Sequence, residues 1–495
     1  MSERSEFLNT IGAARVAARS GATFATYNPF TAQPWALIPR CGPEDVGDAV
    51  SAALRAFNSS TWRGLTATQR GKLLARLADL IEAEAESLAA IEVRDNGKLA
   101  MEVRAQLRYI PEWYRYFGGL ADKIEGRVLP IDKPAMHAFT RHDPVGVVAC
   151  ITAWNSPLLL LTWKLAPALA AGNTVVIKPS EHASASTLAF AELFERAGFP
   201  PGVVNTVTGF PEELGDALVR HPAVAKIAFT GSERGGSSVY RNAADGIKRV
   251  TLELGGKSAN IIFADADIDN AVSGAMAGIF AATGQTCIAG SRLLVQRTVH
   301  DQVVEQLVRL AATARMGDPS LPDTQVGPVT TLPQRERVLQ YIEMGRSEGA
   351  QCVLGGKTPE DPRLGPGWFV EPTIFIGVTN SMRIAREEIF GPVLCVIPFA
   401  DEAEAIAIAN DSPYGLAAGV WTSDAGRMLR MSESLQTGTV WINTYRAVSY
   451  MAPFGGYKRS GIGRESGQEA IHEYLQTKTV WMDTSGKVAN PFVMR

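Results

Sequence analysis

The chain has few cysteines, few histidines and no long uncharged apolar run. Its cysteines, Cys41, Cys150, Cys287, Cys352 and Cys395, are odd in number and far apart. This spacing argues against a disulfide framework and a Cys-x-x-Cys metal site, and it favours a reducing, cytoplasmic compartment. The 6 histidines never occur at His-Glu-x-x-His spacing, so we expect no metal.

Neither a membrane nor a nucleic acid is indicated as a partner. No apolar segment reaches the roughly 20 residues that a membrane helix needs, and residues 1–20 lack the apolar core of a signal peptide. A net charge of -3 provides no basic surface for nucleic acid or anionic lipid. With 495 residues, 46% of them hydrophobic, the composition predicts a large soluble protein of about three domains.

Residues 1–120 are predicted to be mostly helical. Thr66 and Gln69 form a capping box before a long amphipathic run, and Gly97 follows its end. The predicted helices cover residues 43–57, 70–92 and 101–120. The segment 124–141 alternates polar and apolar residues and is broken by prolines, which suits a protruding hairpin better than a central strand.

From residue 145 onward, short apolar strands alternate with helices. This alternation indicates βαβ units and a parallel sheet with both faces covered. The first series predicts strands over 146–152, 174–177, 203–208, 225–229 and 249–252, with helices over 158–171, 184–197, 211–221 and 232–244. After a helix that follows Asp267, the second predicts strands over 291–296, 369–378, 393–399, 417–421 and 439–443, with helices over 300–314, 332–348, 402–410 and 425–435. A β-prone tail, 474–481, is expected to pair outside its own domain.

Two glycine-rich stretches are weak matches to phosphate-binding loops. Residues 255–258 read Gly-Gly-Lys-Ser, but Thr251 stands where a Walker A loop needs its first glycine. Residues 229–236 lie between the fourth strand and a helix, where a dinucleotide-binding turn belongs. The spacing there, Gly-x-x-x-Gly-Gly, is not the standard one, so this stretch alone is weak evidence for a dinucleotide.

One cysteine lies in a stretch that suits covalent catalysis. Cys287 stands between a helix-like apolar segment and a predicted strand, with Gly284 and Gly290 on either side. A thiol in such a turn, with backbone N–H groups around it, fits a nucleophile. A buried structural cysteine explains the same stretch equally well.

Eight segments occur together, in order, over nearly the whole chain: 144–158, 163–173, 178–181, 229–232, 253–258, 284–287, 388–393 and 453–465. Together they resemble the NAD(P)-dependent aldehyde dehydrogenase superfamily. The resemblance implies an α/β fold of two parallel-sheet domains, a variant Rossmann cofactor domain and a catalytic domain, with a small β oligomerisation element. It also accounts for the non-standard glycine loop.

The same resemblance implies domain boundaries. Residues 1–122 and 145–254 would form the NAD-binding domain, and 255–455 the catalytic domain. Residues 123–144 and 474–495 would form an oligomerisation hairpin and tail, and 456–473 a return segment on the NAD-binding domain. Unpaired strands are liabilities in a monomer, so a homodimer or homotetramer is expected, and the sequence does not choose between them.

Four residues acquire catalytic roles from the resemblance. Cys287 would attack the aldehyde to give a thiohemiacetal and, after hydride transfer, a thioester. Asn155 and the backbone N–H of Cys287 would hold the oxyanion. Glu253 would activate water to hydrolyse the thioester to a free acid; relatives that pass the acyl group to coenzyme A usually lack this glutamate. Glu465 resembles a proton-relay glutamate of some members, and a helix-capping acid explains it equally well.

The implied cofactor is NAD, with NADP less favoured. Lys178 and Glu181 match a pair at the adenine-side ribose, and the Glu181 carboxylate would repel a 2′-phosphate. Ser232 would lie beside the pyrophosphate, Glu388 would hold the nicotinamide ribose, and Phe390 would lie near the ring or in the core. The other implied cofactor residues are Ile151, Thr152, Trp154, Ser180, Gly209, Phe229, Thr230, Gly231 and Leu254.

The implied acyl pocket is formed by Ser156, Leu160, Trp163, Thr286, Ile288, Val448 and Phe454. Many hydrolytic relatives carry aromatic side chains where this chain has Ser156 and Val448, so we expect a bulky apolar or aromatic aldehyde. Arg446 supports a second hypothesis, a carboxylate-bearing semialdehyde, although such an arginine is more often structural. A hypothesis of another class, an esterase or acyltransferase that uses Cys287 without redox turnover, stays open.

Overall fold

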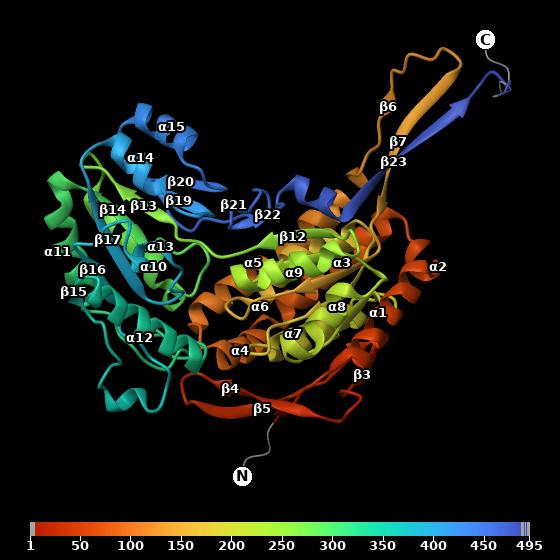
Figure 1. Cartoon of the computed structure of the whole chain (residues 1–495). Coiled ribbons are helices and arrows are strands. Elements are labelled where there is room, and N and C mark those ends of the chain that lie inside the picture. The colour runs from red at the N-terminus through yellow and green to blue at the C-terminus, as the bar shows by residue number, and fades with distance from the viewer. Residues whose placement is uncertain (1–4, 487–489, 491, 493–495) are drawn as a thin grey trace.

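The computed structural model describes residues 5–486, 490 and 492. Two α/β units, each built on its own sheet, lie side by side, and a small third sheet projects from them as an arm (Figure 1). This arrangement confirms the predicted fold of two parallel-sheet units with a small β element.

The first large sheet has the strand order β10-β9-β8-β11-β12-β22. Its five parallel strands are β8 (Val147–Ile151), β9 (Thr174–Lys178), β10 (Val204–Thr206), β11 (Val224–Thr230) and β12 (Arg249–Glu253), all close to the predicted ranges. The strand β22 (Gly461–Ile462) adds antiparallel to β12. Helices α6 (Pro157–Ala170), α7 (Ala185–Arg196), α8 (Asp216–Arg220) and α9 (Glu233–Ala244) connect the parallel strands.

The chain reverses its direction of travel across this sheet between β8 and β11. Strands β8, β9 and β10 follow one another towards one edge, and the chain then returns to place β11 on the other side of β8. In open α/β sheets, the crevice at such a switch point is where ligands bind.

The second large sheet has the order β15-β16-β17-β14-β13-β19-β20. Its parallel strands are β13 (Ala259–Ile262), β14 (Arg292–Gln296), β16 (Thr373–Ile376), β17 (Val393–Phe399), β19 (Ala417–Trp421) and β20 (Thr439–Ile442). The helices are α10 (Ile268–Phe280), α11 (His300–Ala311), α12 (Leu332–Ser347), α14 (Glu402–Asn410) and α15 (Ala425–Ser434). The sequence reading missed β13 and the antiparallel edge strand β15 (Gln351–Leu354), which are short and lack a clear period.

Residues 5–120 are mostly helical, as predicted, but the sequence analysis did not foresee the strands that precede Pro43. Residues 5–39 form five strands, β1 (Ser5–Glu6), β2 (Asn9–Ile11), β3 (Ala14–Val16), β4 (Thr23–Asn28) and β5 (Gln33–Pro39). Most of their side chains stay partly exposed, so a two-residue hydrophobic period hardly develops. Tertiary packing, such as burial of Trp35 against α7, decides their structure.

Helix predictions beyond residue 40 are confirmed with one change. Helices α1 (Pro43–Asn58) and α5 (Ala100–Leu120) form as expected, and the Thr66–Gln69 capping box is present. The run 70–92 is divided into α3 (Ala67–Ala83) and α4 (Ala85–Asn96), because the chain leaves helical geometry at Glu84. Gly97, with φ of 75°, ends α4.

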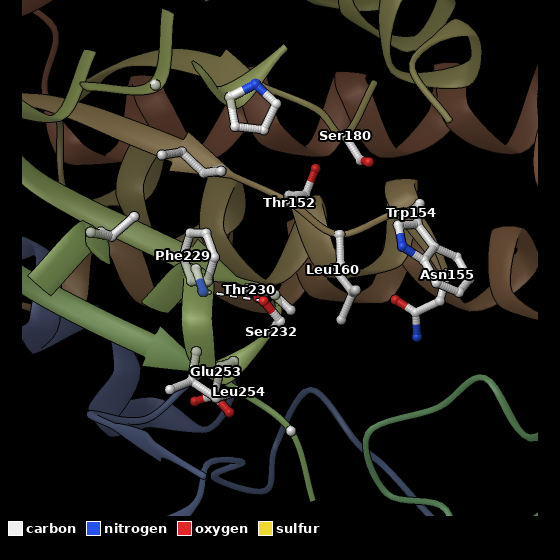
Figure 2. Close-up of a pocket in the computed structure, with 18 of the residues that line it drawn as sticks. Thr152, Trp154, Asn155, Leu160, Ser180, Phe229, Thr230, Ser232, Glu253 and Leu254 are labelled. Atoms are coloured by element: carbon white, nitrogen blue, oxygen red, sulfur yellow. Dashed lines mark hydrogen bonds between the residues drawn. The ribbon is translucent and has the colours of Figure 1, made fainter. Parts of the chain in front are cut away.

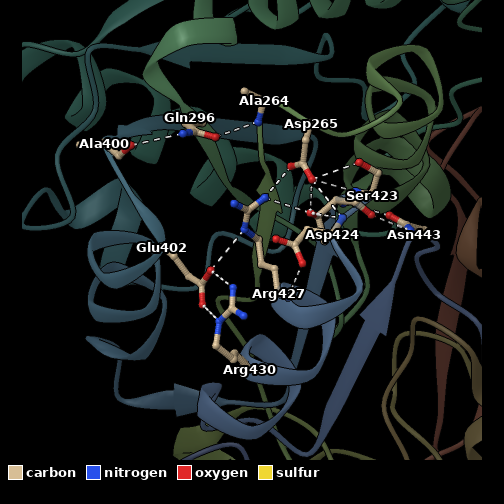
Figure 3. Close-up of polar contacts among 11 residues, drawn as sticks. Ala264, Asp265, Gln296, Ala400, Glu402, Ser423, Asp424, Arg427, Arg430 and Asn443 are labelled. Carbon is tan, nitrogen blue, oxygen red and sulfur yellow. Dashed lines mark hydrogen bonds and ion pairs between the residues drawn. The ribbon is translucent and has the colours of Figure 1, made fainter.

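Asp265 ties the end of β13 to the start of α15 (Figure 3). Its Oδ2 accepts hydrogen bonds from the backbone N–H groups of Ser423 and Asp424, each at 3.1 Å. Arg427 contacts Asp265 at 2.6 Å and Glu402 on α14 at 3.3 Å. Burial opposes ionisation, but these partners hold the pKa of Asp265 below its usual value. The cluster therefore fixes α14 and α15 at the carboxyl edge of the second sheet.

The arm is a three-stranded sheet of β6 (Val128–Leu129), β7 (Met136–Pro144) and β23 (Leu475–Asp483). The tail strand pairs antiparallel with β7 from Leu475 opposite Pro144 to Asp483 opposite Met136, as the hairpin prediction required.

Residues 487–489, 491 and 493–495 of the predicted tail lie outside the described residues. Helices long and apolar enough for a membrane crossing are absent from the described part of the chain.

We propose that the arm packs against a second copy of the chain. Val128 is 70% exposed and Trp481 52% exposed, and β23 leaves one backbone edge unpaired within the described arm. The wild-type protein should have at least dimeric mass by light scattering, whereas Val128→Glu/Trp481→Glu should have a lower mass. Tyr240→Glu, which alters an equally exposed aromatic on α9, is the control. A monomeric wild-type protein would contradict the proposal.

Candidate active site

A cavity of about 440 Å³ opens at the switch point between β8 and β11. Figure 2 shows Trp154 and Asn155, which follow β8, on one side of it and Phe229 and Glu253 on the other. Every residue predicted to bind the cofactor lines this cavity except Gly209. A Cβ at Gly209 would lie 2.5 Å from Leu214 Cδ2, so this glycine serves close packing.

The cavity also brings Cys287, Asn155 and Glu253 together. Asn155 follows β8, Glu253 ends β12, and Cys287 lies between the short 3-10 turn η3 (Ala281–Gly284) and β14. Three residues far apart in sequence thus share one wall because the two sheets meet here.

Cys287 follows a turn that its own residues disfavour. Ala282 and Thr283 have φ of 52° and 55°, a left-handed conformation that costs roughly 1–2 kcal/mol per non-glycine residue. Ala282 N–H donates to Glu102 Oε1 at 2.9 Å, and Thr283 Oγ1 donates to the Gly327 carbonyl at 3.1 Å. At Gly284, a Cβ would lie 2.1 Å from the Gly391 carbonyl oxygen. Tertiary contacts therefore stabilise the turn.

Backbone close to Cys287 is fixed from two further directions. Tyr445 Oη donates to the Ile288 carbonyl at 3.0 Å, and a Cβ at Gly290 would lie 2.9 Å from that Oη. A Cβ at Gly256 would lie 2.6 Å from the Cys287 carbonyl oxygen. Because they lack a side chain, Gly290 lets Tyr445 Oη come close to the backbone, and Gly256 does the same for the Cys287 carbonyl. The sequence reading did not recognise this positioning role of Tyr445.

The Cys287 thiol is protonated in this environment. Burial, followed by the nearby carboxylates of Glu388 and Glu253, raises the pKa of Cys287 to about 12. Backbone N–H groups of Ile288 and Cys287 act in the opposite direction. Since the thiolate is the nucleophilic form, this cysteine needs a base to accept its proton.

Asn155 points its carboxamide at the nucleophile loop. It is 8% exposed, and its Nδ2 donates to the Gln285 carbonyl at 2.9 Å. One N–H of the same amide group remains for another acceptor. Gln285 precedes Cys287 by only two residues, so Asn155 is placed to donate a hydrogen bond to an oxyanion formed at Cys287.

Glu253 is a buried carboxyl with no hydrogen-bond partner on either oxygen among the described residues. Burial first, then the negative charge of Glu465, raises the pKa of Glu253 well above its usual value. A carboxylate with a raised pKa is a stronger base.

Glu465 is paired with a lysine and does not cap a helix. Its Oε1 contacts Lys164 Nζ, which also donates to Thr230 Oγ1 at 2.6 Å. The following 3-10 segment, η6 (Gln468–Tyr474), has Gly467 at its N-cap. The ion pair therefore lies in the buried layer next to Glu253.

Glu388 explains the Gly-Gly pair that resembled a phosphate loop. Gly256 N–H donates to Glu388 Oε1 at 3.1 Å, and a Cβ at Gly255 would lie 2.3 Å from Glu388 Oε2. Glycine is required because the carboxylate approaches the backbone directly. Burial raises the pKa of Glu388 to about 7. Phe390 packs edge-on against Trp154 with ring centroids 5.2 Å apart.

The outer part of the cavity holds the predicted ribose pair and pyrophosphate turn. Lys178 Nζ lies 3.9 Å from Glu181 Oε2 and donates to the Pro179 carbonyl at 3.1 Å. Ser232 caps α9, accepting from Gly235 N–H at 3.1 Å. The start of α9 therefore faces the cavity with its positive dipole end.

Sequence reasoning missed several cavity residues. Gln334 on α12 donates to the Ile389 and Phe390 carbonyls at 2.9 and 3.0 Å, and Arg337 donates to the Glu388 carbonyl at 3.3 Å. Their helix shows no motif, so only its position in the fold reveals them. The other unpredicted lining residues are Ala153, His182, Pro211, Gly215, Asp216, Val219, Gly235, Ser238, Val239, Asn242 and Gly255.

The predicted acyl pocket has an aromatic wall. Trp163 packs against Trp113 and Phe454, with ring centroids 6.1 and 4.9 Å apart. Of the seven predicted pocket residues, Leu160 alone also lines the cofactor cavity. Ser156 is buried and accepts a hydrogen bond from Lys98 Nζ, which the sequence reading did not foresee. The Arg446 Nη1 donates to the Ala277 carbonyl at 3.2 Å.

Comparison with known proteins agrees with this arrangement. The family model for the aldehyde dehydrogenase family matches residues 16–480. A (Z)-2-((N-methylformamido)methylene)-5-hydroxybutyrolactone dehydrogenase of Acinetobacter baylyi is 50% identical over 477 residues, 96% of this chain and 97% of the relative. A betaine aldehyde dehydrogenase of Bacillus subtilis is 43% identical over 465 residues, 94% of this chain and 95% of the relative.

Solved structures agree in fold. A betaine aldehyde dehydrogenase of Staphylococcus aureus in complex with NAD+ has a TM-score of 0.97 at 40% identity, covering 98% of this chain and 97% of that chain. An aldehyde dehydrogenase of Bacillus cereus in its NAD+ complex has a TM-score of 0.94 at 46% identity, covering 97% of both chains. The chain belongs to the aldehyde dehydrogenase family of oxidoreductases.

Proposed function

We propose that the protein oxidises an aldehyde to a carboxylic acid with NAD, through a thioester on Cys287 that water hydrolyses. The observation that carries this proposal is that one cavity joins Cys287, Asn155 and Glu253 to the predicted dinucleotide-binding residues. The NAD+ complexes of structural relatives support the choice of cofactor.

The cavity residues fit a dinucleotide. The Lys178–Glu181 pair offers partners for ribose hydroxyls, the start of α9 suits a pyrophosphate, and Glu388 offers a second ribose acceptor. When bound there, NAD accepts a hydride from the substrate carbon. The remaining steps belong to side chains of this chain.

Cys287 and its neighbours perform the covalent step. The thiol gives its proton to water, which passes it to solvent, and the sulfur bonds to the aldehyde carbon. The oxyanion that forms is held by Asn155 Nδ2 and the backbone N–H of Cys287. Preorganised donors of this kind typically contribute about 10²–10³ in rate.

Glu253 then activates the water that attacks the thioester. The C–S bond breaks, and the acid leaves while Cys287 regains its thiol. The raised pKa of Glu253 lets it accept a proton from water more readily than an ordinary carboxylate does.

The acyl group is proposed to be bulky and apolar or aromatic. The aromatic wall of Trp113, Trp163 and Phe454 supplies apolar surface. We expect the short side chains of Ser156 and Val448 to leave room beside it. The Arg446 contact with the Ala277 carbonyl gives no support for a carboxylate-bearing substrate.

Replacement of Cys287 and of Glu253 should separate formation of the thioester from its hydrolysis. Cys287→Ala should reduce aldehyde oxidation more than about a thousandfold while cofactor binding persists, as measured by fluorescence titration. Glu253→Gln should accumulate acyl-enzyme, visible by mass spectrometry, because water is no longer activated.

In the wild-type enzyme, hydrolysis should decline as pH falls through the raised pKa of Glu253, above the range of an ordinary carboxyl.

Cys352→Ala, at a half-buried cysteine remote from the cavity, is the matched control. Undiminished hydrolysis in Glu253→Gln would remove Glu253 as the base. Ester cleavage without any aldehyde-dependent reduction of NAD would favour an esterase instead.

Glu181→Ser should weaken the preference for NAD. Loss of the carboxylate removes repulsion of a 2′-phosphate, so kcat/KM for NADP relative to NAD should rise about tenfold, equivalent to roughly 1.4 kcal/mol. Glu192→Ser on α7, outside the cavity, should leave the ratio unchanged. An unaltered ratio in Glu181→Ser would contradict this assignment.

Val448→Phe should narrow the acyl pocket. The kcat/KM for aromatic and long-chain aldehydes should fall at least about tenfold relative to acetaldehyde, because a larger ring takes up space beside Phe454. Arg446→Ala should leave this ratio unchanged. A preference for succinate semialdehyde that disappears in Arg446→Ala would overturn the apolar assignment.

A further inference from the structure

Lys98 places a buried ammonium group beside the predicted acyl pocket. The residue follows Gly97, whose left-handed conformation ends α4, and it is only 7% exposed. Its Nζ donates to Ser156 Oγ and, at 3.4 Å, to Gln106 Oε1 on α5. Ser156 is one of the predicted acyl-pocket residues and directly follows Asn155, which lines the cofactor cavity. A charged donor therefore contacts the residue next to the proposed oxyanion donor.

One N–H of this ammonium group remains for another acceptor. A lysine ammonium group has three N–H donors, and the contacts with Ser156 and Gln106 use two of them. In the described part of the chain, Lys98 forms no ion pair that would use the third, and Glu92 and Glu102 act on it only from a longer range. A buried donor without an acceptor is costly. The third N–H is therefore available to an oxygen that enters the acyl pocket.

The charged groups around Lys98 balance one another. Burial lowers the pKa of Lys98, the carboxyl groups of Glu92 and Glu102 oppose this effect, and the Arg446 guanidinium adds to it. With two acidic and two basic groups, this part of the pocket carries little net charge that would attract a carboxylate. The acceptor that suits it best is a neutral oxygen, as in an ether, a carbonyl or a hydroxyl group.

One face of α5 joins the polar contacts of Lys98 to the aromatic wall of the acyl pocket. The residues of this face are three or four positions apart, which is helical spacing: Glu102, Gln106, Tyr109 and Trp113. Tyr109 packs edge-on against Trp113 with ring centroids 4.9 Å apart, and Trp113 stacks on Trp163. Polar and aromatic groups therefore follow one another along the same side of one helix.

The polar end of this face contacts the nucleophile loop. Glu102 Oε1 accepts the hydrogen bond from Ala282 N–H, in the left-handed turn before Cys287. The side chain of Cys287 packs against the apolar cluster that contains Trp113 and Trp163. An acyl group on Cys287 therefore has both the aromatic wall and the polar start of α5 beside it.

We propose that Lys98 binds a neutral oxygen acceptor on the acyl group of the substrate. The inference rests on the proposed aldehyde oxidation and narrows its substrate class to bulky aldehydes that carry an ether, carbonyl or hydroxyl oxygen. The third N–H of Lys98 donates to that oxygen, while the aromatic wall covers the apolar part of the same group. Lys98 acts only in binding and in the choice of substrate, because no bond of the substrate changes there.

An ether oxygen in place of a methylene group separates this inference from purely apolar binding. The ether and the hydrocarbon have almost the same shape. An apolar pocket prefers the hydrocarbon, because burial of an oxygen without a hydrogen bond is costly. A pocket with an available donor reverses this order, because it satisfies the oxygen and leaves its own donor unsatisfied with the hydrocarbon.

The full-length enzyme should be assayed for NAD reduction with two matched pairs of aldehydes. One pair is meta-methoxybenzaldehyde and meta-ethylbenzaldehyde, and the other is heptanal and the pentanal with a terminal methoxy group. The wild type should show a kcat/KM about tenfold higher for the ether of at least one pair, as expected for a hydrogen bond from a charged donor. Lys98→Met should abolish this preference by lowering kcat/KM for the ether alone. Lys72→Met, at an exposed lysine of α3, should keep the wild-type ratio.

A second variant keeps the test decisive if Lys98→Met does not fold. Lys98→Met leaves the buried carboxyl of Glu92 without its basic neighbour, which is destabilising. The double variant Lys98→Met/Glu92→Gln removes both charges with little change of volume and should lose the ether preference in the same way. Damage to the fold or to the chemistry lowers kcat/KM for both aldehydes of a pair alike, so the ratio isolates the contact.

An unchanged ratio in Lys98→Met or in the double variant overturns the inference, and so does a wild type that prefers the hydrocarbon of both pairs. A preference for meta-carboxybenzaldehyde over both meta-substituted compounds that disappears in Lys98→Met overturns the neutral acceptor. A wild-type enzyme that reduces no NAD with any aldehyde of the panel overturns the proposed function, and the inference with it. Reduction of NAD with the hydrocarbon aldehydes and no preference for either ether overturns the inference alone.

Discussion

The left-handed turn before Cys287 is the constraint on which the site depends. Ala282 and Thr283 adopt it at a conformational cost, and hydrogen bonds to Glu102 and Gly327 offset that cost. These contacts come from both halves of the molecule. The nucleophile is therefore positioned only when the two α/β units are packed together.

Burial determines the chemistry of the groups around this turn. Glu253 is buried and Cys287 and Glu388 are half-buried, and burial is the chief reason why the pKa of each is raised. Neutral forms are favoured, so proton transfers must accompany the covalent steps. A site of this kind needs both a base beside the sulfur and a way to return protons to solvent.

The connection between the two large sheets brings the residues of the cofactor cavity close to the loop that carries Cys287. β12 ends at Glu253 and β13 begins at Ala259, so the carboxyl edge of one sheet leads directly to the amino edge of the other. Gly255 and Gly256 in this connection leave space for the Glu388 carboxylate and the Cys287 carbonyl. The short connection therefore joins the cofactor cavity to the nucleophile loop.

The sequence by itself determined the alternating strands and helices, the tail strand and the ordered motifs that contain Cys287, Asn155 and Glu253, because hydrophobic period and motif spacing are local properties. It did not determine the strands before Pro43 or β13 and β15, whose short segments lack a clear period. Nor did it indicate Gln334, Arg337, Tyr445 or Lys98. These side chains lie on ordinary helices and loops, and their neighbours come from distant segments. Only tertiary packing decided which polar groups meet around Cys287 and how deeply each is buried.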